Sequence, residues 1–229
     1  MAEQTPETLN HFASLSFTED YWKLPQESRC EVREGFLSRL RKSVDAVHLY
    51  QLAALESRGD LLTWTASASA SPESSRGFFA GWASALAPAR RYLRSSDVLW
   101  GYTRPSQYTK SRSTQELDPF APNREPYLIV YPFVKTPEWY LLDREKRGEL
   151  MAGHIKTGTQ YKDITQLLVY CFGLQDQEFI VAYETNHLER HQDLVIALRS
   201  TEARRYTLRD TPNFTAVHRP LADALALLG

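Results

Sequence analysis

The chain has 229 residues, enough for one large domain or two small ones with a buried core. Its 27 Lys and Arg nearly balance its 28 Asp and Glu, so bulk charge favours neither nucleic acid nor an anionic membrane surface as a partner. Cys30 and Cys171 stand far apart, which argues against a disulfide scaffold and a zinc knuckle. The first ten residues lack a basic start and an apolar core, and no run approaches the roughly 20 apolar residues of a membrane span. We therefore expect a soluble cytoplasmic protein with reduced thiols.

Helix and strand patterns alternate along the chain. Residues 47–52 and 61–64 alternate as strands do, whereas 31–42 shows the apolar spacing of a helix. The first half predicts strand, helix, strand, strand, helix and strand over 11–18, 26–42, 45–55, 60–67, 73–86 and 97–103. The second half predicts the same order over 126–134, 143–155, 164–172, 177–184, 187–199 and 205–215. Each half thus has the βαββαβ order of a ferredoxin-like fold.

An internal duplication supports this division. Residues 21–29 (YWKLPQESR) match 139–147 (WYLLDREKR), and at the same offset Asp45 meets Asp163. The register holds for about 40 residues, which is long for a chance match. We expect an α+β protein of two tandem ferredoxin-like modules, residues 1–104 and 126–229, joined by a linker over 105–125 that is rich in proline, serine and charge. The two sheets would pack as a dimeric α+β barrel and leave a cavity between sheet and helices for a large ligand.

Among the six histidines, His154 has a distinctive place. It ends the predicted helix 143–155, and residues 155–158 are expected to form a turn directly after it. An imidazole there can present one nitrogen to a cavity while the other meets an acceptor, as a metal ligand requires. His187 and His191 have the i,i+4 spacing of a zinc pair, but they lack the glutamate of the zinc-binding helix motif.

The usual motifs of hydrolases, P-loop proteins and dinucleotide-binding proteins do not occur in the sequence. A haem site needs a neutral imidazole, an apolar aromatic slot, and cationic or hydroxyl groups for the propionates. Aromatic residues make up 12% of the chain and suit either a pocket or ordinary core packing. The candidates for binding propionates are Tyr131, Lys135, Tyr108, Lys110 and Arg112. On composition alone, a solvated loop beside an edge strand is the simpler interpretation of these five residues.

Four collinear segments resemble the chlorite dismutase and coproheme decarboxylase superfamily. They are 103–110 (TRPSQYTK), 131–140 (YPFVKTPEWY), 149–154 (ELMAGH) and 173–185 (GLQDQEFIVAYET). The resemblance implies two ferredoxin-like modules, with haem b or coproheme bound in the second, and a homo-oligomeric ring, most simply a pentamer. It implies His154 as the proximal iron ligand and Tyr131 and Lys135 as the groups of propionate chemistry, with the radical on Tyr131. Trp139 and Tyr140 match the aromatic pair beside the haem.

The sequence departs from the family pattern on the distal side. Chlorite dismutases carry an arginine thirteen residues after the proximal histidine, and here that position is Leu167. An apolar side chain cannot steer an anionic oxidant as a guanidinium does, so chlorite dismutation is not expected. Gln166 matches the glutamine of many decarboxylases one residue away, but a shift of one residue on a strand reverses the face. We therefore expect Leu167 at the distal position.

A second departure concerns the glutamate that hydrogen-bonds the proximal histidine in the family. That position aligns with Ala203, and a loop adjustment would let the neighbouring Glu202 bond to His154.

The functional hypothesis is a haem-dependent oxidoreductase that activates peroxide or another small oxidant on a small-molecule substrate. One alternative is a coproheme decarboxylase, which Tyr131 and Lys135 favour. Another is a non-catalytic haem carrier or sensor, or a haem-free binding module.

Overall fold

The structure, a computed structural model, describes residues 8–69, 71–106, 108, 114–220, 223, 224 and 226. Its first half has the predicted βαββαβ order, with a short helix and a 3-10 turn added. The elements are β1 (Thr8–Phe17), α1 (Glu19–Trp22), α2 (Gln26–Arg41), β2 (Ala46–Gln51), β3 (Leu61–Ala68), α3 (Pro72–Leu86), η1 (Ala87–Ala89) and β4 (Leu93–Tyr102). Their strands pair in the order β4-β1-β3-β2, which is the ferredoxin-like arrangement.

The second half repeats this order. Its elements are β5 (Tyr127–Lys135), α4 (Pro137–Leu141), α5 (Arg144–Gly158), β6 (Ile164–Tyr170), β7 (Phe179–Thr185), α6 (Leu188–Arg199), η2 (Glu202–Tyr206), β8 (Thr207–Arg209) and β9 (Phe214–His218). The pairings β9-β5-β7-β6 match those of the first half. The predicted final strand over 205–215 is wrong, because this segment divides into η2, β8 and β9. Pro212, which has no N–H to donate to a ladder, lies in the break between the two strands.

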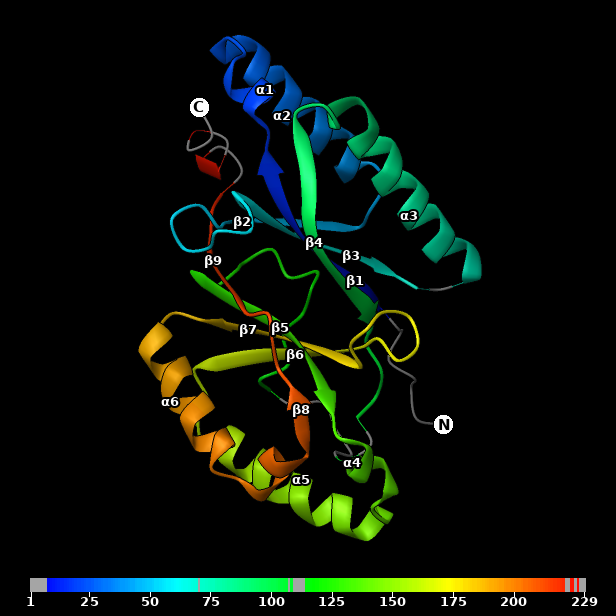
Figure 1. The fold of residues 1–229 in the computed structure, drawn as a ribbon, viewed down its shortest axis with the longest axis vertical. Coiled ribbons are helices and arrows are strands. Elements are labelled where there is room, and N and C mark those ends of the chain that lie inside the picture. The colour runs from blue at the N-terminus through cyan, green and yellow to red at the C-terminus, as the bar shows by residue number, and fades with distance from the viewer. Residues whose placement is uncertain are drawn as a thin grey trace.

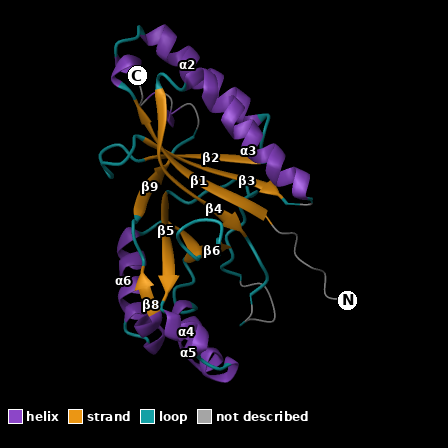
Figure 2. Cartoon of the chain, turned by 45° about the vertical axis from the view of Figure 1, so that its right-hand side comes forward, coloured by secondary structure: helices purple, strands orange, loops and turns teal. Residues whose placement is uncertain are grey.

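The two sheets close into a barrel. β9 pairs with β2 at Tyr50 and Gln51, and β4 meets β6 where Tyr102 pairs with Tyr170. Gly101 permits the second contact, because a Cβ there would lie 2.3 Å from the Tyr170 carbonyl oxygen. Figures 1 and 2 show the helices outside the barrel, with α2 and α3 over the first sheet and α4 to α6 over the second. The expected dimeric α+β barrel is thus confirmed.

The barrel interior is one apolar core to which both modules contribute. Its members include Phe12, Leu62, Trp64, Leu99, Leu128, Val130, Leu167, Val169, Ile180, Ala182 and Phe214. A buried polar bridge also spans it: the Tyr50 hydroxyl of β2 donates to Glu184 Oε1 of β7 at 2.9 Å, and Arg124 lies 3.7 Å from the same oxygen. Within the described residues, none of the helices has both the length and the apolar character that crossing a membrane requires.

Candidate functional site

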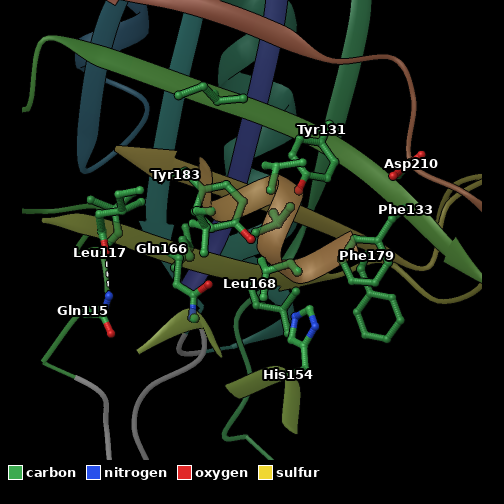
Figure 3. A pocket seen from close by; sticks show the side chains of 18 of the residues that line it. Gln115, Leu117, Tyr131, Phe133, His154, Gln166, Leu168, Phe179, Tyr183 and Asp210 are labelled. Atoms are coloured by element: carbon green, nitrogen blue, oxygen red, sulfur yellow. Dashed lines mark hydrogen bonds between the residues drawn. The ribbon is translucent and has the colours of Figure 1, made fainter. Parts of the chain in front are cut away.

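A cavity of about 2060 Å³ lies between the second sheet and helices α5 and α6. Figure 3 shows side chains of β5, β6 and β7 converging on it from one side and His154 of α5 facing them. In the first module, the space between sheet and helices is filled by a core that includes Phe36, Leu37, Phe78 and Trp82. The duplicated fold therefore offers a large ligand site in its second copy.

The sheet wall of the cavity is apolar and aromatic. Strand alternation directs Ile129, Tyr131 and Phe133 of β5 to the cavity, and Phe179, Val181 and Tyr183 of β7 lie beside them. Leu168 of β6 belongs to the same wall and is 38% exposed although helices cover this face of the sheet. An apolar side chain exposed inside a deep cavity gains free energy when an apolar ligand displaces the water around it.

His154 projects from α5 toward Leu168 (Figure 3). Burial, and after it the charge of Lys135, lower the pKa of its imidazole to about 4, so the ring is neutral near neutral pH. Its Nδ1 atom is buried and has no hydrogen-bond partner in the described part of the chain. Nor do those residues hold any group of three or more His, Cys, Asp or Glu side chains that could bind a metal ion. His154 can therefore act as a lone ligand, which suits a metal already held by a macrocycle.

The local fold around His154 differs from the prediction. Helix α5 begins after Asp143, whose side chain accepts from the Lys146 N–H at 2.7 Å, and it continues to Gly158. The predicted turn over 155–158 is wrong. The Thr159 N–H donates to the Ile155 carbonyl at 2.9 Å, so helical bonding continues past the histidine. His154 consequently lies one turn inside the helix, where the helical backbone fixes its direction.

Tyr131 and Lys135 both border the cavity from β5. Burial raises the pKa of Tyr131, while interaction with the phenol of Tyr183, whose ring centroid is 6.2 Å away, partly lowers it. The Lys135 Nζ lies 4.6 Å from the centre of the Trp139 ring. Burial, and then the nearby Arg204, lower the pKa of Lys135 to about 8. An incoming carboxylate would restore full protonation to this ammonium, because an anion nearby favours the charged form.

The other predicted ligand-binding residues have different outcomes. Trp139, Tyr140 and Tyr108 border the cavity. The Tyr140 hydroxyl donates to Glu178 Oε2, so its proton already has an acceptor within the protein. Lys110 and Arg112 lie outside the described residues.

The prediction for Leu167 names the wrong face of β6. Leu167 adjoins the cavity, but its side chain is 3% exposed and packs in the barrel interior. Its cross-strand partner Ala182 belongs to the same interior core, whereas the partner of Leu168 is Val181, which borders the cavity. Gln166 and Leu168 are the residues that face the cavity (Figure 3). The count of thirteen residues from His154 therefore selected the residue on the other face of β6.

The prediction for Glu202 is also wrong. Its carboxylate pairs with Arg205 at 2.8 Å, and its side chain is 69% exposed. The residues of η2 that border the cavity are Ala203, which is 2% exposed, and Arg204. The 3-10 turn directs Glu202 to solvent, so it gives His154 no hydrogen bond.

Tyr183 and His191 also border the cavity, and neither was predicted to do so from the sequence. Tyr183 is 5% exposed and lies diagonally across the ladder from Tyr131, since Ile129 is its direct partner. His191 of α6 stands 5.1 Å from the Tyr183 ring, and its Nε2 is buried without a hydrogen-bond partner among the described residues. The alternation of β7 could have indicated Tyr183. His191 was recognisable by its place on the apolar stripe with Leu194 and Leu198.

Fold and site together define an α+β barrel of two ferredoxin-like modules with a histidine-bearing ligand cavity in the second. Residues 20–219 match the family profile described as Chlorite dismutase, and the chain belongs to this family. It is 33% identical over 192 residues to a coproheme decarboxylase of Mycolicibacterium smegmatis, covering 82% of this chain and 79% of the relative. It is 24% identical over 151 residues to a chlorite dismutase of Ideonella dechloratans, covering 61% and 53%.

Solved structures agree with this assignment. A mutant chlorite dismutase from Candidatus Nitrospira defluvii superposes with a TM-score of 0.82 at 26% identity, covering 96% of this chain and 94% of that one. The resemblance inferred from the four sequence segments is thereby confirmed at the level of the family.

Proposed function

We propose that the chain binds an iron porphyrin, haem b or coproheme, in this cavity with His154 as the axial ligand. The observation that carries the proposal is the buried, neutral imidazole of His154, which faces a large apolar cavity. A neutral imidazole has the lone pair that iron needs, and the aromatic wall suits a flat macrocycle. The bound iron porphyrin would supply the redox chemistry by which peroxide or another small oxidant is activated. The residues of the chain bind it, orient it and exclude water.

Among reactions of this kind, we favour oxidative decarboxylation of coproheme. Tyr131 and Lys135 line the cavity together, and the Mycolicibacterium smegmatis relative carries this activity in its name. In the balanced step, a propionate, hydrogen peroxide and one proton give a vinyl group, carbon dioxide and two water molecules. Lys135 would hold the propionate by a charge-assisted hydrogen bond. Tyr131, first oxidised to a phenoxyl radical at the expense of the peroxide, would take a hydrogen atom from the propionate side chain and so return to the phenol. Its interaction with Tyr183 would position the phenol.

Chlorite dismutation is disfavoured. Gln166 and Leu168 face the cavity on β6, where a dismutase would need a cation to steer an anionic oxidant. We further propose that the chain forms a homo-oligomer, with a pentamer as the expected size, which analytical ultracentrifugation of the loaded protein tests.

The test of the proposed function is a titration of the purified protein with iron coproporphyrin and with haem b, followed by addition of peroxide. We expect a Soret band that shifts on binding and that His154→Ala alters. Tyr131→Phe should still bind iron coproporphyrin but convert less than about 1% of it, since removing a group that acts in the chemical step costs orders of magnitude. Tyr127→Phe, on the same strand, is the matched control and should convert normally.

Three outcomes would contradict parts of this proposal. A missing Soret band favours a haem-free binding module. A band that His154→Ala does not change removes the assigned iron ligand. Normal binding without any turnover by peroxide favours a haem carrier or sensor.

A further inference from the structure

A smaller notch of about 550 Å³ adjoins the main cavity. It lies between α5 and the segment that contains Ser106 and Tyr108, and these two residues and Ile155 border both spaces. Ile155 directly follows His154, so a ligand held at His154 lies next to the notch. Tyr131 and Lys135 take no part in its walls.

Two arginines give the notch its charge. Arg144 and Arg147 of α5 both line it, and neither guanidinium forms an ion pair within the described part of the chain. The Nε atom of Arg147 is buried and lacks a hydrogen-bond partner among the described residues. A buried donor left unpaired costs free energy that an anionic ligand would recover. By contrast, Lys146 on the same helix pairs with Glu149 at 2.9 Å.

The position of these arginines in the helix adds to the case. Arg144 is the first residue of α5 and Arg147 the fourth, so both cations stand in the first turn. The helix dipole disfavours cations at this end and favours anions. The first turn of α5 therefore combines two partly unpaired cations with a field that attracts negative charge. Both features would be satisfied by an anion in the notch.

We propose that Arg144 and Arg147 bind one of the two carboxylates that coproporphyrin has and protoporphyrin lacks, at a place different from that of the propionate at Tyr131 and Lys135. They would so favour a porphyrin with four carboxylates over one with two. This inference rests on the proposed function and deepens it, because it selects coproheme over haem b as the ligand. The extra carboxylates of coproheme would otherwise leave water for a largely apolar cavity, which is costly without a cation.

The test uses metal-free porphyrins, whose binding does not require an iron ligand. The full-length chain is titrated with coproporphyrin III and with protoporphyrin IX, and the change in porphyrin fluorescence is measured. Arg147→Gln should weaken coproporphyrin binding about tenfold, equivalent to about 1.4 kcal/mol. It should change protoporphyrin binding less than about twofold, since that ligand lacks the additional carboxylates. Arg144→Gln, at an exposed position, is the second variant and should act in the same direction.

Lys156→Gln is the matched control, because it removes one positive charge from the same helix away from the notch. It should leave both affinities unchanged. Equal weakening for the two porphyrins in the arginine variants, or none, would overturn the proposal. His154→Ala should not affect metal-free binding. His154→Ala could leave the affinity for iron porphyrins unchanged while the arginine variants still weaken coproporphyrin binding more than protoporphyrin binding. That result would contradict His154 as the iron ligand and would support the carboxylate site.

Discussion

Burial keeps four histidine side chains of this protein neutral. The pKa of each is lowered to about 4, mainly by loss of contact with water: His11, His48, His154 and His191. Only His154 and His191 border the cavity. His11 lies among Phe78, Phe79 and Trp82 of the first module, with its ring centroid 4.7 Å from that of Trp82. Burial thus leaves a neutral imidazole in the core of the first module and two neutral imidazoles at the cavity of the second.

His11 makes acid sensitivity testable at the scale of one residue. Its pKa is near 6.5 in the unfolded chain and about 4 in the folded one, so between these values the unfolded state binds a proton that the folded state does not. The free energy of unfolding should therefore fall as pH falls through this window. Between pH 7 and pH 5, the free energy of unfolding of His11→Phe should decrease by about 2 kcal/mol less than that of the parent chain. Urea unfolding at both pH values measures this difference.

The exposed His187 provides the control, and His187→Gln should keep the acid sensitivity of the parent chain. If His11→Phe loses stability with acid as steeply as the parent does, burial of His11 is not the source of the effect.

Residue roles were predictable where they depend on local sequence. His154, Tyr131, Lys135 and Trp139 border one cavity, as the family resemblance of segments 131–140 and 149–154 implied. The role of Leu167 depended on counting thirteen residues from His154, and the role of Glu202 depended on aligning the family's glutamate with Ala203. One residue of error on a strand, or a 3-10 turn in place of a loop, reverses the direction of a side chain.

At the scale of elements, successive residues of β6 face two different environments: Leu167 faces the barrel interior and Leu168 faces the cavity. We expect Leu167→Arg to destabilise the fold by more than about 3 kcal/mol, because it places an unpaired charge in the barrel interior. Leu168→Arg should cost less than about 1 kcal/mol, since its head group can remain in the water-filled cavity. Chemical denaturation of the two ligand-free variants measures both values.

The two arginine substitutions on β6 change charge and volume identically and so control for each other. Greater damage from Leu168→Arg would mean that Leu168, and not Leu167, faces the interior. It would restore Leu167 as the distal residue.

The order of helices and strands was predictable because the sequence is duplicated, with residues 21–29 matching 139–147 at a constant offset. The boundaries were less so. The predicted helix ends at residue 155 and gives way to a turn that contains Gly158, yet α5 continues to Gly158, because helix propensity is a weak preference that tertiary packing overrides. The break between β8 and β9 follows from Pro212, but only the pairing of β9 with both β5 and β2 shows why two short strands are needed.

At the scale of the molecule, the shared barrel interior should make the two modules unfold together. Leu128 of β5 is fully buried in that core beside residues of β1 and β3. Leu128→Ala should lower stability by about 2–5 kcal/mol. Hydrogen exchange should then speed up in β1 and β3 of the first module as much as in β5.

Leu194→Ala, in the separate cluster beneath α6, offers a comparison within the second module. Faster exchange confined to the second module in Leu128→Ala would show that the modules unfold independently and that the common interior does not couple them.

Closure of the barrel also limits how copies of this chain can associate. Apart from the short β8, which pairs with β5 alone, each described strand has a hydrogen-bonded neighbour on both sides along at least part of its length. An open edge is the template on which foreign strands add and cross-β polymers grow, and this design largely removes it. The proposed assembly of copies would then rely mainly on contacts between side chains of helices and connecting loops. The shape of the subunit surface, and not backbone pairing between strands, would then determine how subunits are arranged in a ring.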